Sequence, residues 1–200
     1  MTADSLAPDA ALDLLVQGNQ RFVAGKGKAF TGFRADLAAS QNPFAVVVGC
    51  SDSRVPAEIV FDVGIGDLFV VRVAGNIVAP SQVGSVEFAV SQFGTRLVVV
   101  MGHTRCGAIG ATLRALQGED PDSSSIASIT DRIAPHIRDI AARETDPVRR
   151  GEASIVANVR ASVSHLSYGS RILEQLMLAQ RLKIVGAVYA VESGVVSLLP

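Results

Sequence analysis

Apolar residues along the chain follow two periodicities, which predict two kinds of element. Four short runs are continuously apolar, as expected for strands buried on both faces of a sheet. These runs cover residues 44–49, 68–73, 97–102 and 184–191. The segment 12–22 instead places its apolar residues at helical spacing, after a proline and an aspartate that are typical of a helix start. It predicts an amphipathic N-terminal helix of about four turns.

The segments between the runs predict helices and turns. Residues 83–93 mix apolar and polar positions, which indicates a crossover helix, and residues 126–182 are helical in character. Breaks in the second segment are expected at Pro135, at Asp146–Pro147 and near Gly169. The polar stretch 118–125 predicts an exposed loop.

Strands that alternate with helices predict an α/β fold with a mostly parallel central β-sheet flanked by helices. A turn at residues 192–194 predicts that residues 195–199 return as a C-terminal hairpin strand. The N-terminal segment is expected to form a helical arm over about residues 9–40. Because no repeat or linker divides the chain, residues 1–200 are expected to form a single domain.

Composition narrows the possible functions. The chain has 200 residues, 48% of them hydrophobic, and its 19 acidic side chains nearly balance 18 basic ones. Such a balance predicts neither nucleic acid nor an anionic membrane surface as a partner. The longest apolar runs are far shorter than the roughly 20 residues of a membrane-spanning helix. Since the N-terminus lacks the pattern of a secretory signal, a cytoplasmic location is expected.

Two polar clusters directly follow the first and third apolar runs. They read Cys50-Ser51-Asp52-Ser53-Arg54 and His103-Thr104-Arg105-Cys106-Gly107. Ligands bind at the carboxyl ends of parallel strands, so the two clusters can converge on one site. Zinc takes such ligands in tetrahedral geometry, and four are available: Cys50, Asp52, His103 and Cys106. A lone cysteine or histidine is more often a packed residue, but two clusters at strand ends are hard to assign to packing alone.

These motifs resemble the paired signature of the β-carbonic anhydrases. Further matches lie outside the candidate ligands, and the similarity spans nearly the whole chain. The further matches cover residues 18–22, 56–58, 66–72, 74–76 and 84–89. The resemblance implies one Zn²⁺ per chain and a homodimer or homotetramer. It also implies active sites near the subunit interface, with the N-terminal helix lying across the partner.

The activity implied by the resemblance is the reversible hydration of carbon dioxide to bicarbonate and a proton, by attack of zinc-bound hydroxide. Asp52 then has two alternative roles. As a fourth ligand it closes the site, whereas in a charge-assisted pair with Arg54 it leaves that position open and orients the hydroxide. We expect the ligand role at low pH and the pair with Arg54 at high pH.

Related bacterial enzymes carry a regulatory bicarbonate site built from a Trp, an Arg and a Tyr. Arg72 and Tyr189 match the last two positions, but Val47 stands at the first, so the site is incomplete. Both residues are candidates for bicarbonate binding or for a structural role. Three further side chains are candidates for the carbon dioxide pocket because of their positions near the motifs: Val55, Val73 and Phe88.

Three alternative functions stay open. Relatives with the same fold hydrolyse carbonyl sulfide or carbon disulfide, and the zinc motifs do not separate these substrates from carbon dioxide. In a thiol hydrolase, Cys50 or Cys106 would be a nucleophile activated by His103. In a non-catalytic protein the zinc would be purely structural, although structural sites are closed by four strong ligands.

Overall fold

The four apolar runs form the parallel strands of one sheet. The computed structural model describes residues 6–28 and 35–200, apart from the side chain of Asp36, and it orders the strands β2-β1-β3-β4-β5. The parallel strands are Ala45–Gly49 (β1), Leu68–Arg72 (β2), Leu97–His103 (β3) and Lys183–Tyr189 (β4). The hairpin strand Val196–Leu198 (β5) pairs antiparallel with β4. The predicted fold class is confirmed.

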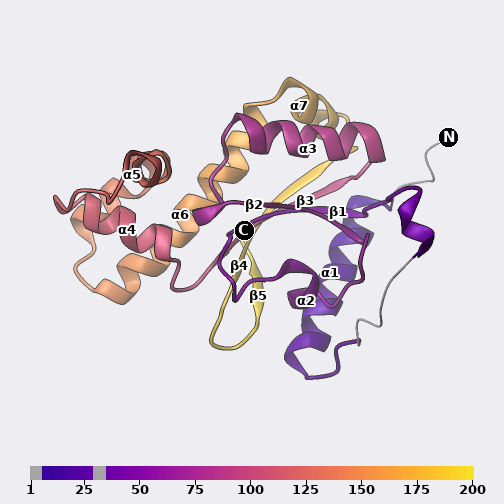
Figure 1. Cartoon of the computed structure of the whole chain (residues 1–200), viewed down its shortest axis with the longest axis horizontal. Helices are drawn as coiled ribbons and strands as arrows, with labels where there is room; N and C mark the ends of the chain where they lie inside the picture. Colours follow the sequence, from indigo (N-terminus) through magenta and orange to yellow (C-terminus); the bar gives the residue numbers. More distant parts are fainter. Residues whose placement is uncertain (1–5, 29–34) are drawn as a thin grey trace.

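Helices cover both faces of this sheet. They are Pro8–Val23 (α1), Ala57–Val60 (α2), Pro80–Phe93 (α3), Gly107–Ala115 (α4), Ser124–Arg143 (α5), Pro147–Tyr168 (α6) and Arg171–Leu178 (α7). In Figure 1, α1 and α2 lie on one face, and α3, α6 and α7 lie on the other. Helices α4 and α5 pack beside α6, beyond the ends of the strands.

The two central strands explain why continuous apolar runs were needed. Every residue of β1 and β3 is buried, because both faces of each strand are covered. Val47 and Val99 pack toward α1, whereas their neighbours Val46 and Val98 pack toward α3 and α6. Burial of one such side chain contributes about 1.5–3 kcal/mol, so an alternating polar pattern would be strongly destabilising here. No helix in the described residues is long and apolar enough to span a membrane.

The predicted break at Pro135 is wrong, because α5 continues through this residue. Pro135 lies on the exposed side of the helix, and the residue four positions earlier is exposed as well. Proline removes one helical N–H, and water can bond the carbonyl that this N–H would have reached. The other two breaks are confirmed: α6 begins at Pro147, with Asp146 as its N-cap, and ends before Gly169.

The described part of the N-terminal segment contains one α-helix. Helix α1 ends at Val23, and its 16 residues agree with the predicted length of about four turns. A short 3₁₀ helix follows at Ala35–Ala38, so the expected arm over residues 9–40 is not one continuous helix. Residues 29–34 of the arm lie outside the described residues. Ala11 and Leu15 bury one side of α1 against the sheet.

An ion pair joins α1 to the segment that follows α2. Arg21 Nε donates to Asp62 Oδ2, and the backbone N–H of Lys28 donates to Oδ1. Asp62 is only 5% exposed. Burial by itself raises the pKa of Asp62, but the hydrogen bonds from Arg21 and Lys28 outweigh burial and lower it.

We expect Asp62→Asn to lower the free energy of unfolding by about 1–3 kcal/mol, because it removes the charge that these donors bind. Asparagine tolerates the positive φ of 47° at this position, so the backbone is not perturbed. A folded-state pKa below the unfolded value of about 3.9 stabilises the protein above that pH, and the contribution is lost as the pH falls through the folded pKa. Urea unfolding should therefore show a smaller difference between variant and wild type at about pH 2.5 than at about pH 7. A difference independent of pH would contradict this.

Candidate metal centre

Three side chains of the kinds that bind metals meet at the carboxyl ends of β1 and β3. Cys50 follows β1, His103 ends β3 and Cys106 directly precedes α4. Their ligand atoms all lie within 4.8 Å of one another, and all three residues are buried. The two strands are adjacent and parallel, so their ends meet although they are far apart in the sequence. Two thiols and one imidazole form a donor set that suits zinc.

The ring of His103 has one nitrogen in use and one free. Nδ1 lies 2.9 Å from the carbonyl oxygen of Thr104 and can donate to it. That contact leaves Nε2 with a lone pair. Among the described residues, buried Nε2 has no hydrogen-bond partner, and Asp52 Oδ2 lies 3.9 Å from it. Because an unpaired buried nitrogen is costly, ligation of a metal would satisfy it, and these residues fit a divalent ion.

The two thiols compete for one proton. The hydrogen bonds from the Cys106 thiol and the Gly75 N–H, together with the neighbouring His103 ring, lower the pKa of Cys50 to about 4, against the effect of burial. The same contact with Cys50, together with burial, raises the pKa of Cys106. The Gly75 nitrogen lies 3.3 Å from Cys50 Sγ. Metal binding requires both thiolates, so it releases the remaining proton and strengthens as the pH rises.

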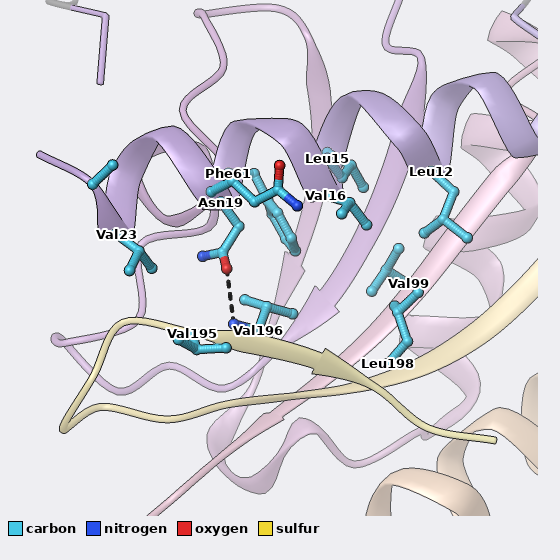
Figure 2. Close-up of a pocket in the computed structure, with 12 residues that line it drawn as sticks. Leu12, Leu15, Val16, Asn19, Val23, Phe61, Val99, Val195, Val196 and Leu198 are labelled. Atoms are coloured by element: carbon cyan, nitrogen blue, oxygen red, sulfur yellow. Dashed lines mark hydrogen bonds between the residues drawn. The ribbon is translucent and has the colours of Figure 1, made fainter. Parts of the chain in front are cut away.

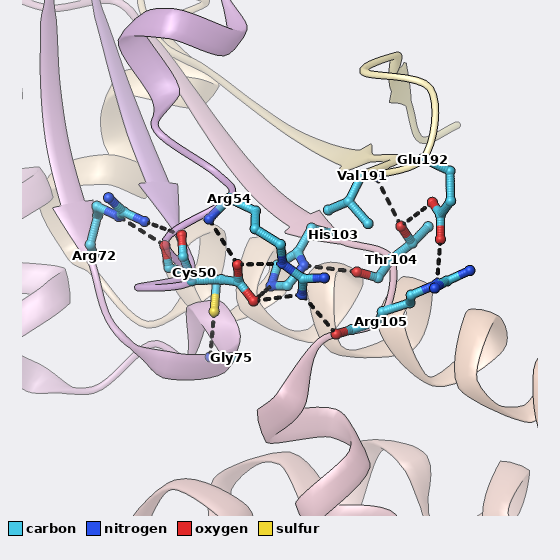
Figure 3. Close-up of polar contacts among 10 residues, drawn as sticks. Cys50, Arg54, Arg72, Gly75, His103, Thr104, Arg105, Val191 and Glu192 are labelled. Atoms are coloured by element: carbon cyan, nitrogen blue, oxygen red, sulfur yellow. Dashed lines mark hydrogen bonds and ion pairs between the residues drawn. The ribbon is translucent and has the colours of Figure 1, made fainter.

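Asp52 is held by Arg54 rather than grouped with the three ligand atoms. Arg54 Nε lies 2.9 Å from Oδ1 and Nη2 lies 2.8 Å from Oδ2, and the backbone N–H of Arg54 also donates to Oδ1. The guanidinium holds the pKa of Asp52 well below its usual range. Arg54 Nη2 also donates to the carbonyl oxygen of Arg105 at 3.3 Å (Figure 3). Of the two arrangements predicted for Asp52, this structure contains the pair with Arg54.

Arg72 supports the backbone of the first motif. Its Nε donates to the carbonyl oxygen of Cys50 at 2.9 Å, and its Nη2 donates to that of Asp52 at 2.6 Å (Figure 3). Tyr189 is buried at the end of β4, which β1 and β3 separate from β2 in the sheet order, and Val47 lies in the core. These contacts favour the structural alternative for Arg72, and bicarbonate binding stays a prediction.

The candidates for the carbon dioxide pocket do not all lie together. Val73 packs against the cluster that contains both cysteines, and Val55 is buried under the first motif. Phe88 is instead 52% exposed, and its ring packs against Phe93 and Phe69, with ring centroids 5.6 Å and 6.3 Å away. Closeness in sequence does not say which face of α3 a residue occupies, and a pocket role for Phe88 stays a prediction.

Sequence reasoning missed Glu192, which holds the turn between His103 and Cys106. The Thr104 hydroxyl donates to Glu192 Oε2 at 2.7 Å, and Arg105 Nε lies 2.7 Å from Oε1 (Figure 3). Arg105 has a φ of 56°, which residues other than glycine rarely adopt, so neighbouring contacts must hold it. Glu192 comes from the turn between β4 and β5, and nothing in the sequence connects it with this site.

A separate apolar cavity of about 340 Å³ lies between α1 and β5 (Figure 2). Leucine and valine side chains supply most of its lining, among them Leu12, Val16 and Leu198. Asn19 is a polar residue in its wall, and its amide binds the backbone of neighbouring segments, including the N–H of Val196. None of the metal-centre residues lines this cavity, so it is not part of that site.

Comparisons with known proteins agree with this geometry. Residues 45–196 match the carbonic anhydrase family. Carbonic anhydrase 2 of Mycobacterium tuberculosis is 38% identical over 190 residues, which cover 94% of this chain and 90% of the relative. The carbonic anhydrase of Mycolicibacterium smegmatis is 41% identical over 194 residues, which cover 96% of this chain and 93% of the relative. In fold, the chain is similar to a tetrameric β-carbonic anhydrase of Sordaria macrospora, with a TM-score of 0.72 and 22% identity. The match covers 96% of this chain and 92% of that structure. The chain therefore belongs to the β-carbonic anhydrase family of enzymes.

Proposed function

We propose that this enzyme holds one Zn²⁺ per chain through Cys50, His103 and Cys106 and catalyses the reversible hydration of carbon dioxide to bicarbonate and a proton. One observation carries the proposal: two buried thiols and a ring nitrogen of His103 lie within 4.8 Å of one another, His103 Nε2 has no hydrogen-bond partner among the described residues, and Arg54 holds Asp52 aside. Three protein ligands and an open fourth position are typical of catalytic zinc, whereas structural zinc has four protein ligands.

When bound, zinc would supply a Lewis acid that lowers the pKa of a water at the open position. Two thiolates donate more charge than neutral imidazoles, so we expect that pKa to exceed the value of about 7 found with three histidines. Asp52 stays ionised because Arg54 lowers its pKa, and its Oδ2 lies 3.9 Å from His103 Nε2. From there the carboxylate can accept a hydrogen bond from the reacting water and orient it toward carbon dioxide.

Stopped-flow hydration of carbon dioxide, measured on protein of known zinc content, tests this proposal. We expect one zinc per chain and a rate that rises between about pH 6.5 and pH 9. Removal of zinc by a chelator should abolish the activity, and added zinc should restore it. Fully active protein without a transition metal would contradict the proposal. Faster turnover of carbonyl sulfide or carbon disulfide in the same assay would instead change the substrate and leave the zinc site intact.

We also propose that the chain forms a homodimer or homotetramer, as the family resemblance implies. The described residues include large apolar side chains of α1, β5 and the turn before β5 that are 37–45% exposed, which suits a subunit contact. They are Leu14, Val16, Val23, Val195 and Leu198. Sedimentation equilibrium should give a mass of at least twice that of the chain, and a monomer at micromolar concentration would contradict this. A cytoplasmic location, with neither nucleic acid nor membrane as a partner, stays a prediction.

A further inference from the structure

The loop after β2 has an unusual backbone conformation next to the metal centre. It forms the short 3₁₀ helix Ala74–Asn76 (η2), in which Gly75 has a φ of 69° and Asn76 a φ of 44°. Positive φ is uncommon for residues other than glycine, although asparagine tolerates it better than most, and two such residues in a row need support from their surroundings. Gly75 and Asn76 are both buried, so the protein interior must hold this conformation.

One face of α6 supplies the contacts that hold this loop. Asn158 Nδ2 donates to the carbonyl oxygen of Gly75 at 2.7 Å, and Ser162 Oγ donates to that of Asn76 at 3.0 Å. Asn158 and Ser162 are four residues apart and therefore lie on the same side of the helix. They are only 2% and 5% exposed, so water cannot readily replace either hydrogen bond.

Tight packing fixes the distance between α6 and the metal centre. A Cβ atom at Gly102, which directly precedes His103, would lie 2.5 Å from Val159 Cγ2 of α6. A Cβ atom at Gly75 would lie 2.8 Å from Ile133 Cδ1 of α5. The loop is thus confined between α5 and α6, and α6 itself is seated on the strand that carries His103.

One backbone N–H of the confined loop points toward the metal centre. The N–H of Gly75 donates to Cys50 Sγ at 3.3 Å, in the same residue whose carbonyl Asn158 holds (Figure 3 shows the Gly75–Cys50 contact). A hydrogen bond to a metal-bound thiolate stabilises its negative charge and reduces its electron donation to the metal. Asn158 therefore holds the residue whose N–H donates to the Cys50 sulfur.

We propose that Asn158, assisted by Ser162, is a positioning residue of the metal centre. It directs the Gly75 N–H toward Cys50 and so sets metal affinity and the electronic character of the thiolate. It does not touch the metal or the substrate. This inference rests on the proposed function in one respect, namely that Cys50 binds the metal.

Cobalt binding tests the inference without measuring catalysis. Co²⁺ alone is titrated into zinc-depleted protein, with a chelator as competitor, and the thiolate-to-cobalt charge-transfer band is recorded at saturation. Asn158→Leu keeps much of the volume but removes the donor, and we expect it to weaken Co²⁺ binding about 10- to 100-fold. The band should move to longer wavelength, because a thiolate without its N–H donor gives up charge more easily. A purely structural role would lower stability but leave the band of the bound metal unchanged.

The same helix offers two serines for a matched comparison, one as the control and one as the test. Ser154 is fully buried on α6, and no group in the described part of the chain forms a hydrogen bond with its hydroxyl. We expect Ser154→Ala to leave the affinity within about twofold and Ser162→Ala, the same chemical change, to weaken it about 2- to 10-fold. If Asn158→Leu does not fold, this pair decides the question.

The outcomes separate the inference from the proposed function. If wild-type protein shows the thiolate band but Asn158→Leu and Ser162→Ala match wild type in affinity and band position, the inference is overturned and the metal centre stands. If wild-type protein shows no thiolate-to-cobalt band, the proposed function fails and the inference fails with it.

Discussion

Replacing Cys106 with serine is expected to remove stoichiometric zinc and to lower the rate of carbon dioxide hydration by at least about 1,000-fold. A serine hydroxyl is not ionised near neutral pH, so it cannot replace a thiolate as a ligand. Loss of the Lewis acid costs several kcal/mol of transition-state stabilisation, and each 1.36 kcal/mol is about a tenfold change in rate. Cys50→Ser should behave alike, because the two sulfurs belong to one cluster. Zinc content and stopped-flow rates provide the measurement.

Ser154→Ala is a suitable control, since it removes a buried hydroxyl that has no hydrogen-bond partner among residues 6–28 and 35–200, and it should keep both zinc and activity. The thiol-hydrolase alternative also predicts inactive cysteine variants, so zinc removal from wild type is the deciding comparison. A thiol nucleophile would keep its activity without zinc and lose it on alkylation. A Cys106→Ser protein that hydrates carbon dioxide at the wild-type rate would refute the assignment of the site.

Replacing Arg54 with methionine is expected to keep zinc but to lower the hydration rate near neutral pH about 10- to 100-fold. In the structure, three donors of Arg54 hold both carboxylate oxygens of Asp52. Without the guanidinium, the donor left to Asp52 among the described residues is the backbone N–H of residue 54, and its carboxylate can take the fourth position at the metal. The site would then be closed by a fourth protein ligand.

In Arg54→Met, the rise of the hydration rate with pH is expected to move in one direction, toward higher pH. Because Arg54 lowers the pKa of Asp52, this carboxylate is ionised throughout the assay range, so its protonation cannot drive the predicted opening at high pH. Opening must instead reflect competition between the carboxylate and hydroxide for the metal. A carboxylate released from Arg54 competes better, so the rise in rate should shift to higher pH in Arg54→Met.

Asp52→Asn combined with Arg54→Met provides the control for this shift. The amide is a weaker ligand than the carboxylate, so the double variant should lose the shift while staying less active than wild type, since the orienting acceptor is gone. An Arg54→Met enzyme with the rate and pH profile of wild type would show that the pair does not gate the site. Loss of zinc from Arg54→Met would show that Arg54 supports the ligands rather than Asp52 alone.

The fold could be predicted to the extent that it depends on local patterns. Strands buried on both faces must be continuously apolar, so β1 and β3 were predictable to within a residue or two. The predicted break at Pro135 was wrong because the cost of a proline in a helix depends on whether the surrounding helix face is exposed to solvent, which is a tertiary property. The exposure of Phe88 is likewise a tertiary property, since only packing decides which face of α3 meets the sheet.

By itself, the sequence determined the fold class and the family, together with the candidate ligands Cys50, His103 and Cys106, because the polar motifs directly follow apolar runs whose parallel ends must meet at one edge. Only the tertiary structure decided the state of Asp52, since pairing with Arg54 and ligation of a metal use the same oxygens and differ by side-chain geometry. It alone also revealed Asn158 and Glu192, whose contacts with the motifs join residues more than 80 positions apart, a distance over which no sequence pattern carries information.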